Sequence, residues 1–353
     1  MEFSTIDAEG NPVEEGKVFY RGRVMTRHAA EQLERLRRGL QEEDRFRGRG
    51  RTRTGPATRR AHRGGREMDD AMSLEDRQLG EVGTAPRASD DERMSTTAFI
   101  CGRGRVGKTV VANTYVQFCR QRGAMLEAWN SDRQNETHTL SVFHNDASRP
   151  ATDGASEKGY WFEANLDRQA RERFDAVLDM AGGDPMVRHL ARDVRLVETM
   201  RRRGLRAVAW HVLGPEPADL DYLKLSMEGE LFAPPATLVV VNTGVLVSGR
   251  SAELAFAEVC SHRVVVDALD RGAKLVRFPS LECMSTIIDQ GLTFADAMRG
   301  VTKPGYQPMT FLDQTRVEIF WKDHIPAFFA EIPSEWLPTM SGHNAEIHEG
   351  GLQ

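Results

Sequence analysis

A glycine-rich turn between an apolar segment and the start of a helix constrains this chain more than any other feature. Residues 96–114 read TTAFICGRGRVGKTVVANT, and G-x-x-x-x-G-K-T is formed there by Gly102, Gly107, Lys108 and Thr109. Glycine lets a chain curl tightly enough to aim several backbone N–H groups at one anion. The start of a helix adds free N–H groups and a partial positive charge. The pattern therefore predicts a strand, a phosphate-binding loop and a helix, in that order.

The loop also predicts a role for its polar side chains. Lys108 is expected to reach the β- and γ-phosphates of a nucleoside triphosphate, and Thr109 to place its hydroxyl on Mg²⁺. The residues expected around the nucleotide in this loop are Gly102, Gly104, Arg105, Val106, Gly107, Lys108, Thr109 and Val110. A surface loop that matches by chance is the alternative, but the order of strand, loop and helix favours phosphate binding.

Composition limits the class of protein further. The 353 residues have room for two domains, or for one large domain with a tail. The formal charge of −5 gives no overall attraction to nucleic acid. The four cysteines, Cys101, Cys119, Cys260 and Cys283, form no C-x-x-C pair and are expected to be reduced core thiols of a cytoplasmic protein. No apolar run approaches the roughly 18 residues that span a bilayer, and the N-terminus is unlike a signal peptide.

Residues 1–95 differ in composition from the remainder. A helix is expected over residues 26–43, followed by a segment that begins at Arg45 and ends at Arg66 and contains nine arginines in 22 residues with no acid. Such a segment cannot bury enough apolar surface to offset its chain entropy and is expected to be disordered. It is either an arm that binds DNA phosphates without sequence preference, or a linker without a partner. A third alternative is that it precedes the true start of the protein, because Met94 immediately precedes the globular part.

From Thr96 onward, segments typical of strands and helices alternate, which predicts a doubly wound, mostly parallel α/β sheet with helices on both faces. The expected strands are 98–101, 124–129, 175–178, 205–213, 236–244 and 274–278. The expected helices include 186–203, 219–230, 251–260, 283–298 and a last one over 317–332, which Pro326 should kink or split. Residues 143–166 are expected to be an irregular polar insertion. The predicted division is an extension (1–95), a P-loop domain (96–335) and a flexible tail (336–353).

Two aspartates are the candidate partners of the loop. Ligands of doubly wound sheets bind at the carboxyl ends of strands, where Asp132 and Asp179 are both expected. Magnesium takes a second carboxylate, and hydrolysis needs a group that orients water. Asp179 ends an apolar strand and suits the metal, with a turn-capping carboxylate as the alternative. Asp132 can face the same cleft, with an ordinary loop aspartate as the alternative.

Four segments resemble the ParA/MinD family of P-loop ATPases, which includes plasmid and chromosome partition proteins and division-site regulators. RGRVGKT (103–109) is similar to the family's deviant phosphate loop, K-G-G-x-G-K-T. SDRQNET (131–137) is similar to D-P-Q-x-N, VLDMAGG (177–183) to the D-x-P-P/G-G switch, and VVVNTG (239–244) to the segment whose asparagine can read adenine. The likeness extends from Thr96 to about Gly300, includes a proline after the last strand, and leaves out the arginine-rich arm.

The resemblance implies a ligand, ATP with Mg²⁺, and a homodimer that forms face to face around it. Lys108 matches the phosphate-binding lysine, Asp132 the aspartate that polarises the catalytic water, and Thr109 with Asp179 the magnesium pair. Gly182, Asn242 and Pro279 match positions beside the nucleotide.

Two loop residues depart from the family pattern. Arg103 stands where the family has a lysine that reaches the partner's phosphates, and an arginine can keep that role. Arg105 stands where the family has its second glycine, and it either crowds the loop or adds a cation over the nucleotide.

The function expected from this likeness is a cytoplasmic, slowly hydrolysing ATPase that switches its affinity for an adaptor protein or for DNA, in plasmid or chromosome partition, stability or mobilisation. One alternative is a metabolic synthetase or ligase of the same P-loop class, with a substrate pocket on residues 143–166. Another is a regulator that binds nucleotide without hydrolysis because Arg105 blocks the loop. No membrane anchor is expected, since the last helix lacks a lysine-rich face. His138 and His144 are expected at the polar surface.

Overall fold

The computed structural model describes residues 3–49, 94–132, 139–182, 185–227, 232–247 and 249–341. The arginine-rich arm beyond residue 49 lies outside these ranges, as do His138 and most of the tail expected over 336–353.

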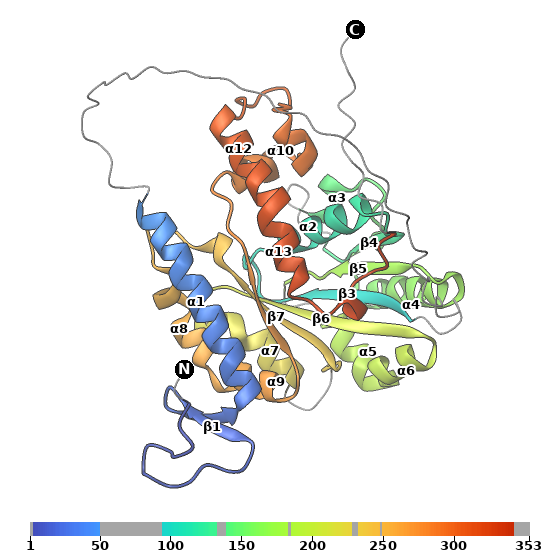
Figure 1. The fold of residues 1–353 in the computed structure, drawn as a ribbon. Helices are drawn as coiled ribbons and strands as arrows, with labels where there is room; N and C mark the ends of the chain where they lie inside the picture. The colour runs from blue at the N-terminus through green and yellow to red at the C-terminus, as the bar shows by residue number, and fades with distance from the viewer. Residues whose placement is uncertain are drawn as a thin grey trace, which may run out of the picture.

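A six-stranded parallel sheet forms the centre of the molecule (Figure 1). Its strands lie in the order β4-β5-β3-β6-β7-β8, and every neighbouring pair is parallel. The strands are β3 (Ser95–Cys101), β4 (Leu126–Asn130), β5 (Asp175–Asp179), β6 (Leu205–Leu213), β7 (Ala236–Asn242) and β8 (Lys274–Phe278). The predicted α/β fold with a mostly parallel sheet is therefore confirmed.

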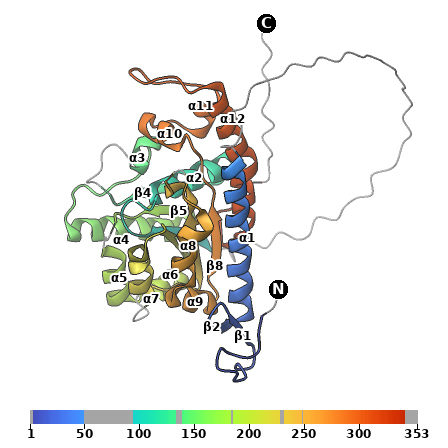
Figure 2. The same ribbon diagram turned by 90° about the vertical axis from the view of Figure 1, so that its left-hand side faces the viewer.

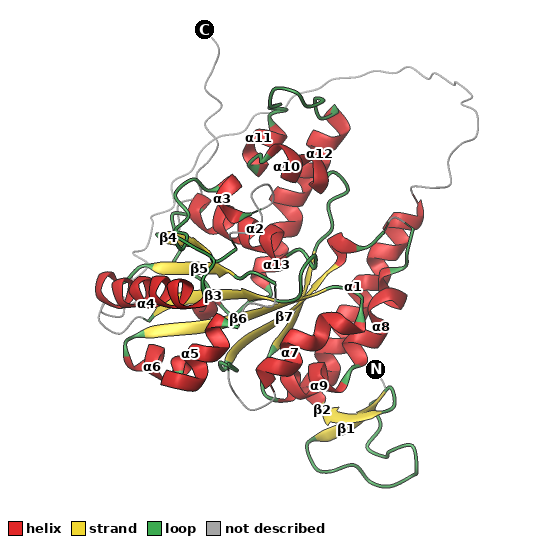
Figure 3. Ribbon diagram, turned by 180° about the vertical axis from the view of Figure 1, so that it is seen from behind, coloured by secondary structure: helices red, strands yellow, loops and turns green. Residues whose placement is uncertain are grey.

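Helices cover both faces of this sheet, so the strands are apolar on both sides. In β3, Ala98 and Ile100 belong to one core cluster, whereas Phe99 and Cys101 belong to another. The first face is covered by α2 (Lys108–Gln121), α10 (Met284–Gln290), α11 (Phe294–Met298), α12 (Phe311–Ile319) and α13 (Ile325–Ala330). The opposite face is covered by α4 (Ala155–Glu172), α5 (Met186–Val194), α6 (Leu196–Arg202), α7 (Asp221–Met227), α8 (Ala252–Ser261) and α9 (Arg263–Asp270). Figure 3 shows the molecule from behind, with the helices of this opposite face in view.

The last helix packs its aromatic residues against the helix that follows the glycine-rich loop. The Phe329 ring stacks on Phe118 with centroids 3.9 Å apart, and it lies tilted against Tyr115 with centroids 6.0 Å apart. As predicted, the helix is divided: a π-helical segment, Phe320–His324, separates α12 from α13. Pro326 lies in the first turn of α13, where its missing N–H costs no intrahelical bond.

Several predicted elements differ from the observed ones. Residues 143–166 are not irregular throughout, because α4 begins at Ala155. The residues on its buried face (Lys158, Phe162, Asn165 and Gln169) have helical spacing but are mostly polar, so hydrophobic periodicity does not reveal the helix. The helix predicted over 186–203 is divided at Arg195, whose φ is 48°, and the one over 283–298 at Gly291, whose φ is 55°. The helix α9, the short α3 (Leu140–Phe143) and the hairpin of β1 (Lys17–Tyr20) and β2 (Arg23–Thr26) were not predicted.

The N-terminal helix α1 (Arg27–Arg49) covers the edge strand β8 (Figure 2). The buried side chain of Gln32 donates to the carbonyl of Ala273 (3.1 Å) and accepts from the N–H of Leu275 (2.8 Å). Gln32 therefore replaces part of the missing neighbour strand, which protects an otherwise exposed sheet edge.

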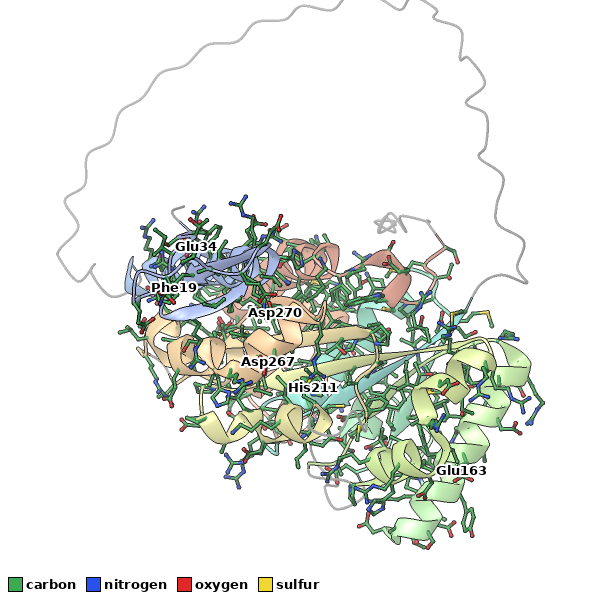
Figure 4. All side chains as sticks on the ribbon, turned by 90° about the horizontal axis from the view of Figure 1, so that it is seen from below. Phe19, Glu34, Glu163, His211, Asp267 and Asp270 are labelled. Atoms are coloured by element: carbon green, nitrogen blue, oxygen red, sulfur yellow. The ribbon has the colours of Figure 1, made fainter. Side chains whose placement is uncertain are left out.

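Hydrogen bonds fix both ends of α1. Near its start, Thr26 donates to Asp270 at the end of α9 (2.8 Å; Figure 4 labels Asp270). Near its end, Asp44 accepts from the backbone N–H groups at the start of α8, including that of Ala252 (2.6 Å), and Glu43 pairs with Arg277 of β8 (2.6 Å). The helix predicted over 26–43 is thus confirmed, and it is longer than predicted and packs into the core.

Candidate functional site

The glycine-rich loop begins at the point where the chain changes direction across the sheet. From β3 the chain continues to β4 and β5 on one side, and it then passes to β6 on the other side. In doubly wound sheets, ligands bind outside the carboxyl ends of the strands at such a point. Because all six strands are parallel, the residues that follow β3, β4, β5 and β7 lie at one edge.

Two glycines are required by the shape of this loop. Gly102 has φ 146°, and a Cβ atom there would lie 2.6 Å from the carbonyl oxygen of Val212. Gly107 has φ 87°, and a Cβ atom there would lie 2.2 Å from Nδ2 of Asn242. The helix α2 starts directly after Gly107 and has no acidic residue in its first turn. Its free N–H groups are therefore available to an anion.

Arg105 has the backbone conformation of a glycine. Its φ is 68°, in the left-handed region where an L-residue is disfavoured by roughly 1 kcal/mol. The loop thus keeps the shape that the second glycine of K-G-G-x-G-K-T would favour, and the arginine side chain extends into solvent.

Lys108, Thr109 and Asp179 are brought together. The Lys108 ammonium group is largely buried and donates to the carbonyl of Arg103 (2.9 Å). The Thr109 hydroxyl donates to Oδ2 of Asp179 (2.8 Å). Burial lowers the pKa of Lys108, while the charges of Asp179 and Asp132 oppose that shift.

Asp179 is suited to bind a cation. Its carboxyl is almost fully buried, and burial raises its pKa to about 6 although the Lys108 charge lowers it. The second oxygen, Oδ1, is buried and has no hydrogen-bond partner among the described residues. Hydroxyl and carboxylate oxygens are the ligands that Mg²⁺ prefers in proteins, so the residues present fit this ion. The described residues contain no cluster of three or more His, Cys, Asp or Glu side chains that would hold a metal by themselves.

Asp132 follows β4 and lies beside this group. Its backbone N–H donates to the side chain of Asn130 (3.0 Å), and its carbonyl accepts from Arg149 (3.1 Å). The negative charge of Asp132 raises the pKa of Lys108 and also that of Asp179. The loop is tied to β5 through Ser131, whose hydroxyl accepts from the N–H of Ala181 (3.0 Å). The rest of SDRQNET, residues 133–137, lies outside the described residues.

Gly182 and Asn242 both contact the glycine-rich loop, Gly182 through a close backbone approach and Asn242 through its side chain. A Cβ atom on Gly182 would lie 2.9 Å from the backbone nitrogen of Gly104, so only glycine allows this approach. Asn242 donates from Nδ2 to the carbonyl of Val106 (2.8 Å) and accepts from the N–H of Gly244 (3.0 Å). Its side chain therefore braces the loop.

The other predicted positions lie at the edges of the site. Val110 is half-buried in the first turn of α2, where its carbonyl accepts from Thr114 (2.8 Å). Pro279 is buried directly after β8, which is the third strand from β3, so the structure does not bring it into the phosphate loop.

Asp219 is a site residue that the sequence reasoning missed. Oδ1 of its buried carboxyl lies 3.7 Å from Nη1 of Arg103, and burial raises its pKa. Gly214 makes room for it, since a Cβ atom there would lie 2.5 Å from Oδ2 of Asp219. Asp219 lies shortly after the end of β6, so the rule that locates ligands at strand ends could have found it.

His144 was expected at the polar surface, and this prediction is wrong. Its ring is buried, with Nε2 lying 3.0 Å from Oδ1 of Asn113. Because Gln117 donates to the same oxygen, Oδ1 is an acceptor and Nε2 of His144 carries the proton. Burial lowers the pKa of His144 to about 4.

No family model matches the chain, and no curated protein is similar to it. Among solved structures, the MinD cell division protein of Aquifex aeolicus is 13% identical, with 64% of this chain and 97% of that chain covered and a TM-score of 0.36. The MinC:MinD cell division protein complex of the same organism is 12% identical, with 61% and 100% covered and a TM-score of 0.34. Likenesses this weak support no statement about activity.

Among the described residues, no helix has the length and apolar character needed to cross a membrane.

Proposed function

We propose that this chain is an ATPase that binds ATP with Mg²⁺ at the loop after β3 and changes state as it hydrolyses the nucleotide. The observation that carries the proposal is the contact between Thr109 and Asp179 beside Lys108, at the start of a helix with free N–H groups. A buried carboxylate oxygen without a partner is costly unless a cation or donor binds it. Bound Mg²⁺ would neutralise charge on the β- and γ-phosphates.

Each polar residue of the site has a role in this proposal. Lys108 and the backbone N–H groups of the loop hold the phosphates, and Thr109 with Asp179 holds the ion. Asp132 orients the attacking water. Arg103 contacts the phosphates bound by a second copy, for which its half-exposed side chain would leave Asp219.

The biological role rests on the resemblance to ParA/MinD proteins. We infer slow turnover, a homodimer that forms only with ATP, an adaptor or DNA-bound partner, and a place in the cytoplasm in plasmid or chromosome partition, stability or mobilisation. Four free cysteines agree with a reducing compartment. Non-specific DNA binding through residues 45–66 belongs to the same proposal.

A regulator that binds nucleotide without hydrolysis is the second candidate. It is favoured by Arg105, whose side chain stands at a loop position with glycine geometry. If ATP binds while Asp132→Ala leaves phosphate release at the background rate of the wild type, this second candidate is correct.

Gel filtration with light scattering tests the proposal on the full chain, with ATP and Mg²⁺ or with ATP and EDTA. We expect a dimer with Mg-ATP, which Lys108→Ala abolishes and Arg103→Ala weakens. Lys322→Ala is the matched control, because that lysine pairs with Glu318 on the surface of the molecule. If Lys108→Ala forms the dimer with Mg-ATP as fully as Lys322→Ala does, the proposal fails.

The DNA contact needs a separate experiment. Removal of residues 1–93 would also remove α1 from the edge of the sheet, so substitution of arginines 51, 53, 59, 60, 63 and 66 by glutamine is preferable. We expect DNA retention to fall and to lose much of its salt dependence. Retention with an unchanged salt dependence would exclude this arm.

A further inference from the structure

A cavity of about 350 Å³ lies between the N-terminal hairpin, α1 and α8. None of the nucleotide-site residues lines it. Its apolar wall comes from buried side chains of these three elements, namely Met25, Leu33, Leu36, Leu40 and Phe256. Pockets of this size that combine an apolar wall with a few polar groups are typical of small-molecule sites.

One polar side of this cavity is already satisfied within the protein. The hydroxyl of Tyr20 donates to Glu34 (2.6 Å), and Arg37 pairs with both Glu34 and Glu253 (3.1 Å each). Burial alone would raise the pKa of Glu34, but the hydrogen bonds from Arg37, Tyr20 and Arg38 lower it to about 2. These groups therefore pair with one another, and their charges largely cancel, so they present little net charge to a ligand.

At the mouth of the cavity, in contrast, two arginine side chains are not paired within the described part of the protein. Arg21 and Arg23 line this mouth, and neither guanidinium group forms an ion pair or hydrogen bond with another described residue. Glu258 is an acid beside them, so the mouth keeps an excess of positive charge. Burial lowers the pKa of His262 close by, the charges of Lys224 and Arg23 lower it further, and the charges of Glu258 and Asp267 oppose the shift.

Arg21 occupies a backbone position that an arginine disfavours. It has φ 49° and precedes Gly22 with φ 84°, so the two form the tight turn between β1 and β2, where Asn-Gly is preferred. Arg173 also has a positive φ, but its guanidinium donates to the backbone carbonyl of Arg203 (3.0 Å). No such internal contact among the described residues accounts for the Arg21 side chain.

We propose that this cavity binds a small amphipathic anion, a carboxylate on an apolar body, with the carboxylate at Arg21 and Arg23. An arginine fork binds a carboxylate in two parallel hydrogen bonds. At roughly 30 Å³ for each water-sized group, the cavity accommodates about a dozen non-hydrogen atoms. A linear carboxylate of ten carbons has this size.

Calorimetric titration of the full chain with decanoate tests this site. Decanol and decyltrimethylammonium have the same tail without the negative charge, and we expect each to bind at least tenfold more weakly than decanoate. Lys108→Ala should leave decanoate binding unchanged. The titration therefore tests this site independently of the proposed nucleotide binding.

Two variants separate a ligand role from a structural one. Arg21→Gly suits the left-handed backbone, so it should keep or raise the unfolding temperature while decanoate affinity falls about tenfold. Ala257→Trp fills the mouth from an exposed position and should abolish binding without loss of folding. Arg195→Gly is the matched control, because it relieves the same backbone strain between α5 and α6.

Three outcomes would overturn the proposal. The first is that decanoate does not bind to the wild type. The second is that decyltrimethylammonium binds as tightly as decanoate. The third is that Arg21→Gly keeps the full affinity for decanoate, because Arg21 would then have only a conformational role.

Discussion

The hydroxyl of Thr109 donates to Asp179 across 2.8 Å and thereby joins the first turn of α2 to the end of β5. These residues are 70 positions apart in the chain. A parallel sheet brings them together, because β3 and β5 are neighbours and Ile100 is paired with Asp179 in their register. The contact links the start of α2 directly to the Asp179 carboxylate.

Substitutions of Thr109 test what the hydroxyl does. Thr109→Val keeps the shape but leaves Oδ2 of the buried Asp179 without its donor, so we expect a loss of about 1–3 kcal/mol in the free energy of unfolding. Thr109→Ser keeps the hydroxyl and should cost less than half as much. Mg²⁺-dependent ATP binding should be lost in the valine variant and retained in the serine variant. Equal ATP affinity in the two variants would show that the hydroxyl does not assist the ion.

The contact between α1 and the sheet edge predicts a second result. Gln32→Met keeps the length of the side chain but removes both hydrogen bonds to β8, leaving the buried N–H of Leu275 unsatisfied. We expect chemical denaturation to show a loss of about 2 kcal/mol, as is usual for an unsatisfied buried donor. Gln41→Met is the control, since Gln41 bonds only a side chain, Glu253 (2.8 Å). If both variants lose the same amount, the edge strand does not depend on Gln32.

Most of the sheet could be predicted from the sequence because parallel strands buried on both faces are continuous apolar runs. The strands over 205–213 and 274–278 have the predicted bounds. The glycine-rich loop was equally clear, since its glycines are required by backbone shape. The buried stripe of α4 is mostly polar, and the helices over 186–203 and 283–298 are divided by left-handed residues, which apolar periodicity does not reveal.

Some residues of the site could not be predicted from the sequence, because only contacts between distant segments bring them together. In the sequence Asp219 is far from Arg103, and only the placement of β6 beside β3 brings the two together. The bond from Asn242 to Val106 likewise spans 136 positions. Asp132 and Asp179 were found because both follow apolar strands, and strand ends share one edge of a parallel sheet.

Two buried histidines predict a pH dependence of stability. Burial lowers the pKa of His211 and of His144 to about 4, from an ordinary value of 6.5. Between these values the unfolded chain binds more protons than the folded chain, so stability is complete above pH 6.5 and falls as the pH drops towards 4. Each histidine then contributes a loss of roughly 3 kcal/mol when the pH falls through this range.

Denaturation at pH 7 and at pH 4.5 measures this effect. His144→Gln keeps a donor for Asn113 and should reduce the difference in the free energy of unfolding between the two pH values, as should His211→Phe. The exposed His189→Gln is the control and should leave the difference unchanged. The interpretation is wrong if all three variants show the slope of the wild type.

Arg105 allows the backbone and side-chain contributions in the loop to be measured separately. Arg105→Gly removes the strain at φ 68° and should raise the free energy of unfolding by about 1 kcal/mol, whereas Arg105→Ala keeps the strain and should not. Both variants remove the guanidinium, so if that cation lies over the nucleotide, both should bind ATP five- to tenfold more weakly. Faster phosphate release in both variants with unchanged affinity would show instead that the side chain crowds the loop. The comparison of Gly with Ala separates the backbone contribution from that of the side chain, because backbone strain differs between the two variants while charge does not.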